Sequence, residues 1–380
     1  MKKRQMMIIM ELSITLLIFG AIIAYAYGDV SGKPYLEKYY VIKKYLLYCC
    51  CGLITSTLLF FISLKITKRN MLLLAYIIGG IGFLLNVFPS GNGLILKYGD
   101  LKYVNFFIVK EKLISINTIL LLFLLLIIND LFQEKRKQEF LVISMINLFF
   151  SFLIAYNGNR GEIFAAHILF AILLIYISKE YSEKYRTVIL LVSILLIGGF
   201  HFYYMIRSGF NLGVWINPFL DPYGIGYMKI QDFHILKSAR IFGRLPYSSR
   251  YSGEILPAIL ISYGWIALLL VLVVFFSLIF VMFHLAHRIS AIFRRKMAFS
   301  ITIYFLIKAI FCIFVFLNIL PFYNGDHFPF IGNDAKIVID LILMGLYCRS
   351  YYENEQKEKI SAKTGRIIIL KDFKSFYDRR

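Results

Sequence analysis

Ten long apolar stretches, separated by shorter polar segments, run through this sequence. They cover approximately 6–27, 45–64, 71–88, 113–132, 139–156, 162–178, 187–204, 255–283, 297–320 and 335–350. A helix needs ~20 apolar residues to cross ~30 Å of hydrocarbon, so each stretch predicts a membrane span. A soluble domain of this length could not bury a composition that is 59% hydrophobic. The pattern therefore predicts an all-α polytopic membrane protein with about ten transmembrane helices.

Clusters of Lys and Arg fix the direction of these spans. They lie at 2–4, 65–69, 135–137, 179–186 and 288–296, and further cations follow in the tail. Each cluster comes before the first stretch or after an even-numbered one, and the positive-inside rule places such clusters in the cytoplasm. We expect residues 1–350 to form the transmembrane domain and 351–380 a cytoplasmic tail, with both chain ends in the cytoplasm. The outward loops are then expected at 28–44, 89–112, 157–161, 205–254 and 321–334.

The formal net charge is +20, and what it indicates depends on where the cations lie along the chain. Because the cations lie mostly between apolar runs, they indicate contact with an anionic membrane leaflet, and we expect no nucleic-acid partner. The five cysteines all lie in apolar runs, without disulfide or zinc spacing. We expect no metal site and no cofactor.

Five arginines fall outside the cytoplasm in this topology, against the usual bias. They are Arg160, Arg207, Arg240, Arg244 and Arg250. Arginine can bind phosphate through two parallel hydrogen bonds, which makes these residues candidate ligands for a phosphate group. The alternative is that long outer loops escape the charge rule and carry ordinary solvated cations. Arg160 lies in the tight turn Gly158-Asn159-Arg160, where it could also anchor a span end or pair with Glu162.

The longest outward loop, 205–254, contains a second feature. Residues 224–243 can form an amphipathic helix whose basic face carries His234, Lys237, Arg240 and Arg244. Its apolar area comes from Phe233, Leu236 and Phe242. Such a helix could lie along the outer membrane surface, where a basic face suits a lipid-linked phosphate. A solvated face on a surface helix is the competing interpretation.

Single acidic and basic residues complete the candidate chemistry. Glu254 precedes the eighth span and could cap that helix or serve as a general base, the role for which His234 is the second candidate. Lys308 and Asp340 lie within adjacent spans. Charged groups inside a membrane usually have a partner. The depths of these two differ by roughly 10 Å, which a long lysine would only partly bridge.

The turn Gly158-Asn159-Arg160 and the segment from Pro246 to Gly264 together resemble the Wzy-type family of O-antigen and capsule repeat-unit polymerases. That resemblance implies a GT-C-like architecture and glycosyl transfer at the outer face of the bacterial cytoplasmic membrane. The substrate would be an undecaprenyl-diphosphate-linked glycan. The cations that would bind it are Arg160, Arg207, Lys237, Arg240, Arg244 and Arg250, with Glu254 or His234 as the base. A chain-length regulator and a flippase are the expected protein partners.

Two alternatives remain open. An O-antigen ligase or another lipid-phosphate glycosyltransferase would need similar residues. A polysaccharide transporter or flippase belongs to a different class, which often shows internal repeats and broken helices. The sequence shows neither feature.

Overall fold

The computed structural model describes ten segments of the chain, namely 2–30, 35–62, 95–98, 101–105, 112–115, 212–224, 226–243, 255–319, 328–332 and 336–352. Their elements are α1 (Lys2–Val30), α2 (Tyr35–Ile62), β1 (Ile95–Tyr98), β2 (Leu101–Asn105), β3 (Lys112–Ser115), α8 (Leu212–Ile216), η1 (Pro218–Leu220), α9 (Tyr227–Ser238), α10 (Ile255–His287) and α11 (Ile292–Phe316). A further helix covers 336–352.

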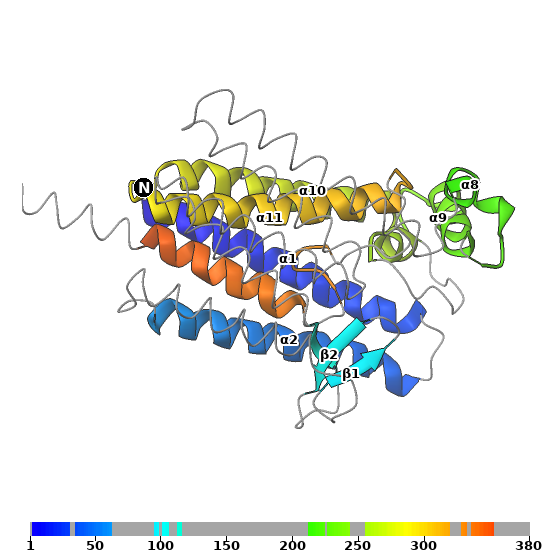
Figure 1. Ribbon diagram of the computed structural model, residues 1–380, viewed down its shortest axis with the longest axis horizontal. Coiled ribbons are helices and arrows are strands. Elements are labelled where there is room, and N and C mark those ends of the chain that lie inside the picture. The colour runs from blue at the N-terminus through cyan, green and yellow to red at the C-terminus, as the bar shows by residue number, and fades with distance from the viewer. Residues whose placement is uncertain are drawn as a thin grey trace, which may run out of the picture.

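The long helices lie lengthwise in one bundle (Figure 1). α1 packs against α2 and α10, and α10 packs against α11. The helix 336–352 lies beside α2, where Gly52 and Gly345 each permit a close approach. Four described helices contain apolar stretches long enough to cross a membrane, which are Met6–Tyr25, Val41–Leu58, Ile255–His287 and Arg294–Phe316. The all-α polytopic membrane architecture expected from the apolar pattern is confirmed.

The helix bounds differ from the apolar runs at one position in particular. α2 begins at Tyr35, about ten residues before the apolar run, so most of the expected loop 28–44 is helical. A helix satisfies its backbone groups internally, and the Tyr and Lys residues of this segment are tolerated where a helix leaves the membrane. The expected spans at 71–88, 139–156, 162–178 and 187–204, and most of 113–132, lie outside the described residues.

A small antiparallel sheet forms in the segment expected as an outward loop at 89–112, and its strand β3 extends into the start of the span expected at 113–132, which is therefore not helical there. β1 pairs with β2 from Ile95 opposite Val104 to Tyr98 opposite Leu101. β2 pairs with β3, with an irregularity between Val104 and Asn105. Alternating apolar and polar residues of this short stretch fit a strand, but the long apolar runs on either side obscure the signal.

A buried ion pair joins α11 to the helix 336–352. Lys308 Nζ lies 2.9 Å from Asp340 Oδ1 and 3.1 Å from Oδ2, and both residues are buried. The expectation that lysine would only partly bridge the gap was wrong. α11 ends at Phe316 rather than at 320, so Lys308 lies about 12 Å from the end of its helix instead of about 18 Å, which brings it closer in depth to Asp340.

The same carboxylate holds a segment that was expected to be an outward loop. The backbone N–H of Phe330 donates to Asp340 Oδ2 over 3.1 Å. Phe330 packs on Phe305, and Phe328 packs on Phe275 in α10. The described part of the loop, 328–332, therefore reaches into the bundle core, where aromatic burial stabilises it.

Replacing Asp340 tests this arrangement. Asp340→Ala leaves the Lys308 ammonium and the Phe330 N–H without their acceptor, and we expect it to destabilise the protein by about 3–5 kcal/mol. Asp340→Asn keeps an oxygen acceptor and should destabilise it less. Thermal unfolding in detergent measures both variants. Equal losses of stability would contradict the importance of the acceptor, and no loss would contradict the pairing itself.

Candidate functional site

Residues 212–224 and 226–243 form a unit at one end of the bundle, which we call the cap. α8, η1 and α9 lie at the end opposite to the start of α1 (Figure 1). Asn217 begins η1 by accepting the N–H of Phe219 through its side chain, and Pro218 follows at the first helical position. Both residues are favourable there, because asparagine caps a helix and proline has no N–H to satisfy.

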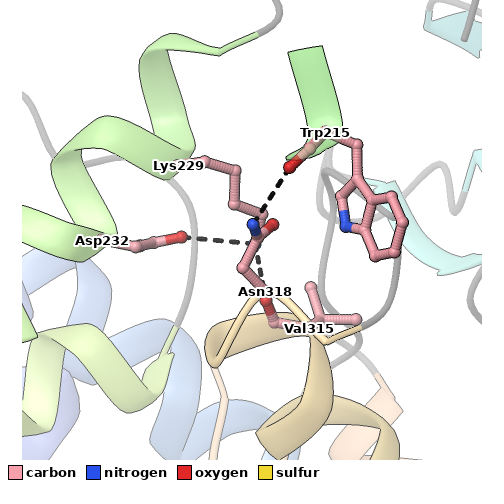
Figure 2. Close-up of polar contacts among 5 residues, drawn as sticks. All are labelled: Trp215, Lys229, Asp232, Val315 and Asn318. Carbon is pink, nitrogen blue, oxygen red and sulfur yellow. Dashed lines mark hydrogen bonds and ion pairs between the residues drawn. The ribbon is translucent and has the colours of Figure 1, made fainter. Parts of the chain in front are cut away.

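The cap is attached to α11 by a buried lysine. Lys229 of α9 donates from Nζ to the backbone oxygen of Val315 over 2.6 Å, and its Nζ lies 3.4 Å from Asp232 Oδ2 (Figure 2). Lys229 and Asp232 are only 1% and 2% exposed. A cation at the carbonyl end of a helix is favourable because the helix dipole is negative there. The contact fixes α9 on the last turn of α11.

The end of α11 is itself shaped for this contact. The N–H of Ile319 donates to Phe314 O over 2.8 Å, and that of Asn318 donates to Val315 O over 3.0 Å. This pattern is a Schellman motif, and Asn318 takes the left-handed conformation with φ 56°. Its side-chain Nδ2 donates to Trp215 O over 3.3 Å (Figure 2). The same turn therefore holds both α8 and α9.

A second attachment occurs where α10 is interrupted. Gly264 has φ 80° and ψ −173°, which breaks the helix within a continuous apolar run. Beyond the break, Trp265 N–H donates to Arg240 O over 3.1 Å and Ile266 N–H donates to Ile241 O over 3.2 Å. Residues 240–243 of the cap thus replace the missing turn of α10. The break was not predicted from the sequence, because a single glycine in an apolar run is not a specific signal for a helix break.

The two attachments place the cap at one membrane level. The part of α10 after the break, 265–287, is about 35 Å long, enough to cross the hydrocarbon. The span Arg294–Phe316 in α11 ends beside Val315, where Lys229 is bound. We therefore expect both contacts to lie near the membrane boundary, a position that the aromatic residues Tyr263 and Trp265 beside the break would suit.

The cap presents basic side chains away from its attached face. His234, Lys237 and Arg240 are exposed, whereas Lys229, Asp232 and Ile235 on the other side of α9 are buried. Both carboxylates of the described cap contact groups within the cap. Asp232 contacts Lys229, and Asp221 Oδ1 accepts the Gly224 N–H over 3.0 Å. The exposed side chains of the described cap therefore carry positive charge, which favours an anionic ligand.

The structure confirms part of the predicted amphipathic helix and corrects the rest. His234 and Lys237 share the exposed side of α9, as expected. The helix, however, covers Tyr227–Ser238 rather than 224–243, and its C-cap is the extended Ala239. Arg240 thus lies beyond the helix, because the following carbonyls bond to α10 instead of continuing the turn.

The remaining sequence candidates stay predictions. Arg160, Arg207, Arg244, Arg250 and Glu254 lie outside the described residues. Among the residues that the structure describes, no three His, Cys, Asp or Glu side chains gather to hold a metal ion. His234 is the only sequence-predicted base whose position the described residues include.

The sequence interpretation missed Lys229 and Asp232. Both lie in phase with Ile235 and Leu236 on the side of α9 that packs against the bundle. Their spacing of three residues on an apolar helix side was the available signal, since two charges there must be paired when buried.

Comparison with solved structures shows what fold this chain resembles. A chain from a peptidoglycan synthase complex that coordinates polymerization and crosslinking matches with a TM-score of 0.66 and 16% identity, covering 92% of this chain and 98% of that one. An Asp-to-Ala variant of the rod shape determining protein RodA from Thermus thermophilus matches with a TM-score of 0.59 and 14% identity, covering 91% and 97%. RodA from the same organism without that substitution gives 0.55 and 15%, covering 91% and 96%. No family model and no curated protein matches the sequence.

These matches correct the resemblance to the Wzy-type polymerases. The solved structures with a similar fold are RodA and a peptidoglycan synthase component. The motifs that suggested the Wzy family cover only about thirty residues around Arg160 and between Pro246 and Gly264. An outward arginine, a proline turn and an aromatic-glycine pair meet general needs at a membrane surface, so they did not distinguish one family from another.

The attachment of the cap to α11 can be tested with a matched pair of lysines. Lys229→Met leaves Asp232 buried without its cation and removes the bond to Val315 O, so local opening of α9 should become easier by about 3 kcal/mol. Hydrogen exchange of α9 amides should then accelerate roughly 100-fold. Lys237→Met, on the exposed side of the same helix, should change exchange little. If both variants behave alike, the buried contact does not hold the cap.

Proposed function

We propose that this chain is a membrane glycosyltransferase that polymerises a lipid-linked glycan at the cap end of the bundle. The observation that carries the proposal is the group of exposed side chains His234, Lys237 and Arg240 on a cap that two attachments hold at one end of the bundle. A lipid diphosphate has its charge at the membrane boundary and its chain in the bilayer. The RodA-like fold supports the same class of enzyme.

The proposed reaction needs few protein groups. The acceptor hydroxyl oxygen forms a bond to the anomeric carbon of the donor glycan, and the bond from that carbon to the lipid diphosphate oxygen breaks. The diphosphate leaves with the electron pair, and the hydroxyl proton passes to a base. Lys237 and Arg240 stabilise the leaving charge, as do Arg160, Arg207, Arg244 and Arg250 if they reach the site. His234 or Glu254 is the base.

We place the protein in a bacterial cytoplasmic membrane with the cap on the outer side. α1 begins and the helix 336–352 ends at the end of the bundle away from the cap (Figure 1). Arg288 follows the end of α10, and Arg294 and Arg295 lie in the first turn of α11, at that same end (Figure 1). The positive-inside rule then orients the bundle with both chain ends, including the tail 351–380, in the cytoplasm.

The glycan unit is proposed to be one carried on undecaprenyl diphosphate. The peptidoglycan synthase complex among the similar structures makes a peptidoglycan precursor the first substrate to test, and it also motivates a search for a protein partner. A chain-length regulator and a flippase as partners remain predictions from the sequence alone.

A transporter of lipid-linked glycans is the second candidate. The observation that favours it is the interruption of α10 at Gly264, because transporters bind substrate at broken helices. The break in α10 is filled by backbone carbonyls of the cap, which leaves those carbonyls unable to bind a substrate there. These facts favour the glycosyltransferase.

Reconstitution distinguishes the two functions. Purified protein in liposomes with an undecaprenyl-diphosphate-linked saccharide should produce a ladder of longer glycans. Lys237→Gln combined with Arg240→Gln should slow chain growth roughly 100-fold by removing charge opposite the leaving diphosphate. Arg160→Ala and Arg250→Ala should likewise leave single units.

Arg288→Gln is the control, because this exposed arginine lies at the opposite end of the bundle. Unchanged ladders in the cap variants would contradict the proposed site. Movement of the lipid-linked saccharide between leaflets without chain growth would instead establish the transporter.

A further inference from the structure

We propose that Gly264 is a positioning residue that acts through Arg240. The inference rests on the proposed function, because it concerns how the diphosphate site is held in place. Gly264 does not itself contact the substrate. It allows the cap segment 240–243 to lie in the break of α10, and this crossing sets where the Arg240 side chain leaves the backbone.

The contact at this crossing is too close for any side chain. A Cβ at Gly264 would lie 2.5 Å from Ile241 O and 2.7 Å from Arg240 O. A Cβ at Gly243 would lie 2.3 Å from Ser262 O, which belongs to the α10 segment at this crossing. The atoms in the way are backbone atoms, which cannot turn aside. Two glycines, one on each segment, are therefore required for the carbonyls of Arg240 and Ile241 to reach the amides beyond the break.

The backbone angles of Gly264 are a second, independent reason why glycine is required at this position. Its φ of 80° with ψ −173° belongs to a region that only glycine adopts readily. An alanine there would change the direction of the chain at the break as well as collide with the cap. Either effect moves Arg240 away from its present position.

The break is also fixed to the rest of the bundle. The hydroxyl of Tyr263 donates to Ile22 O of α1 over 3.1 Å, immediately before Gly264. On the other side of Gly264, the Trp265 N–H donates to Arg240 O. A continuous set of contacts thus runs from α1 through Tyr263 and Trp265 to Arg240. Its effect is to place a guanidinium at a set height above the membrane-spanning part of α10.

The test compares two ligands with the same lipid chain, of which only one carries the diphosphate group. Dissociation constants are measured in nanodiscs for undecaprenyl diphosphate and for uncharged undecaprenol. We expect Gly264→Ala and Arg240→Gln each to weaken diphosphate binding about tenfold and to leave undecaprenol binding unchanged. If Gly264 acts through Arg240, the double variant should also be about tenfold weaker rather than about 100-fold weaker, because the two effects are not independent.

Gly52→Ala serves as the matched control. Its new Cβ would also meet close neighbours, with Leu341 Cδ1 at 2.6 Å, but in the contact between α2 and the helix 336–352. It should leave diphosphate binding unchanged. An additive double variant, or equal weakening of both ligands by Gly264→Ala, would overturn the inference. Normal diphosphate binding by Arg240→Gln would instead overturn the proposed site.

A second measurement covers the case in which Gly264→Ala does not fold. Hydrogen exchange at the amides of Trp265 and Ile266 reports directly on their bonds to the cap carbonyls. Undecaprenyl diphosphate should slow this exchange at least about threefold in the wild-type protein and should not do so in Arg240→Gln. Unchanged exchange in the wild-type protein would contradict coupling between Arg240 and the break.

Discussion

The requirement that backbone groups be paired inside a membrane governs the candidate site. Interrupting α10 at Gly264 leaves the amides of Trp265 and Ile266 without the carbonyls that a continuous helix would offer. In lipid such amides are expensive to leave unpaired. The cap supplies the acceptors at Arg240 and Ile241, so the break and the cap require each other. A loop that could otherwise vary in position is thereby tied to a span.

Buried charge provides the second constraint and acts in the same direction. Lys229 is placed on the carbonyl end of α11, where its charge compensates the helix dipole and contacts Asp232. Deeper in the bundle, the buried charges of Lys308 and Asp340 pair with each other, and Asp340 also accepts the Phe330 N–H. Burial makes each pair costly to break, because removing one partner leaves the other charge unsolvated. A buried lysine therefore sets the position of the cap, and a buried carboxylate, itself paired with a lysine, sets the position of the segment 328–332.

The sequence predicted the features that depend on composition and missed those that depend on contact. Apolar length was sufficient for the four candidate spans among the described residues, and spacing along α9 was sufficient for the shared side of His234 and Lys237. The end of that helix at Ala239 was not predictable, because it follows from carbonyls being used by α10. The burial of Phe328 and Phe330 was missed for a similar reason, since a polar carboxylate in another helix fixes their loop. Residues such as Arg160, Arg250 and Glu254 stay predictions.

The correction of the family resemblance has a physical explanation in the same site. A protein that handles a lipid diphosphate at a membrane surface needs cations at one height, a turn back into the bilayer and aromatic residues at the boundary. Arg240 and the Tyr263-Gly264 pair would suit those needs whichever glycan is attached to the lipid, and Pro246 is a prediction of the same kind from the sequence. Local motifs of this kind report the location and charge of the ligand. The saccharide must be recognised by groups farther from the membrane than the diphosphate, and specificity for it should be sought there.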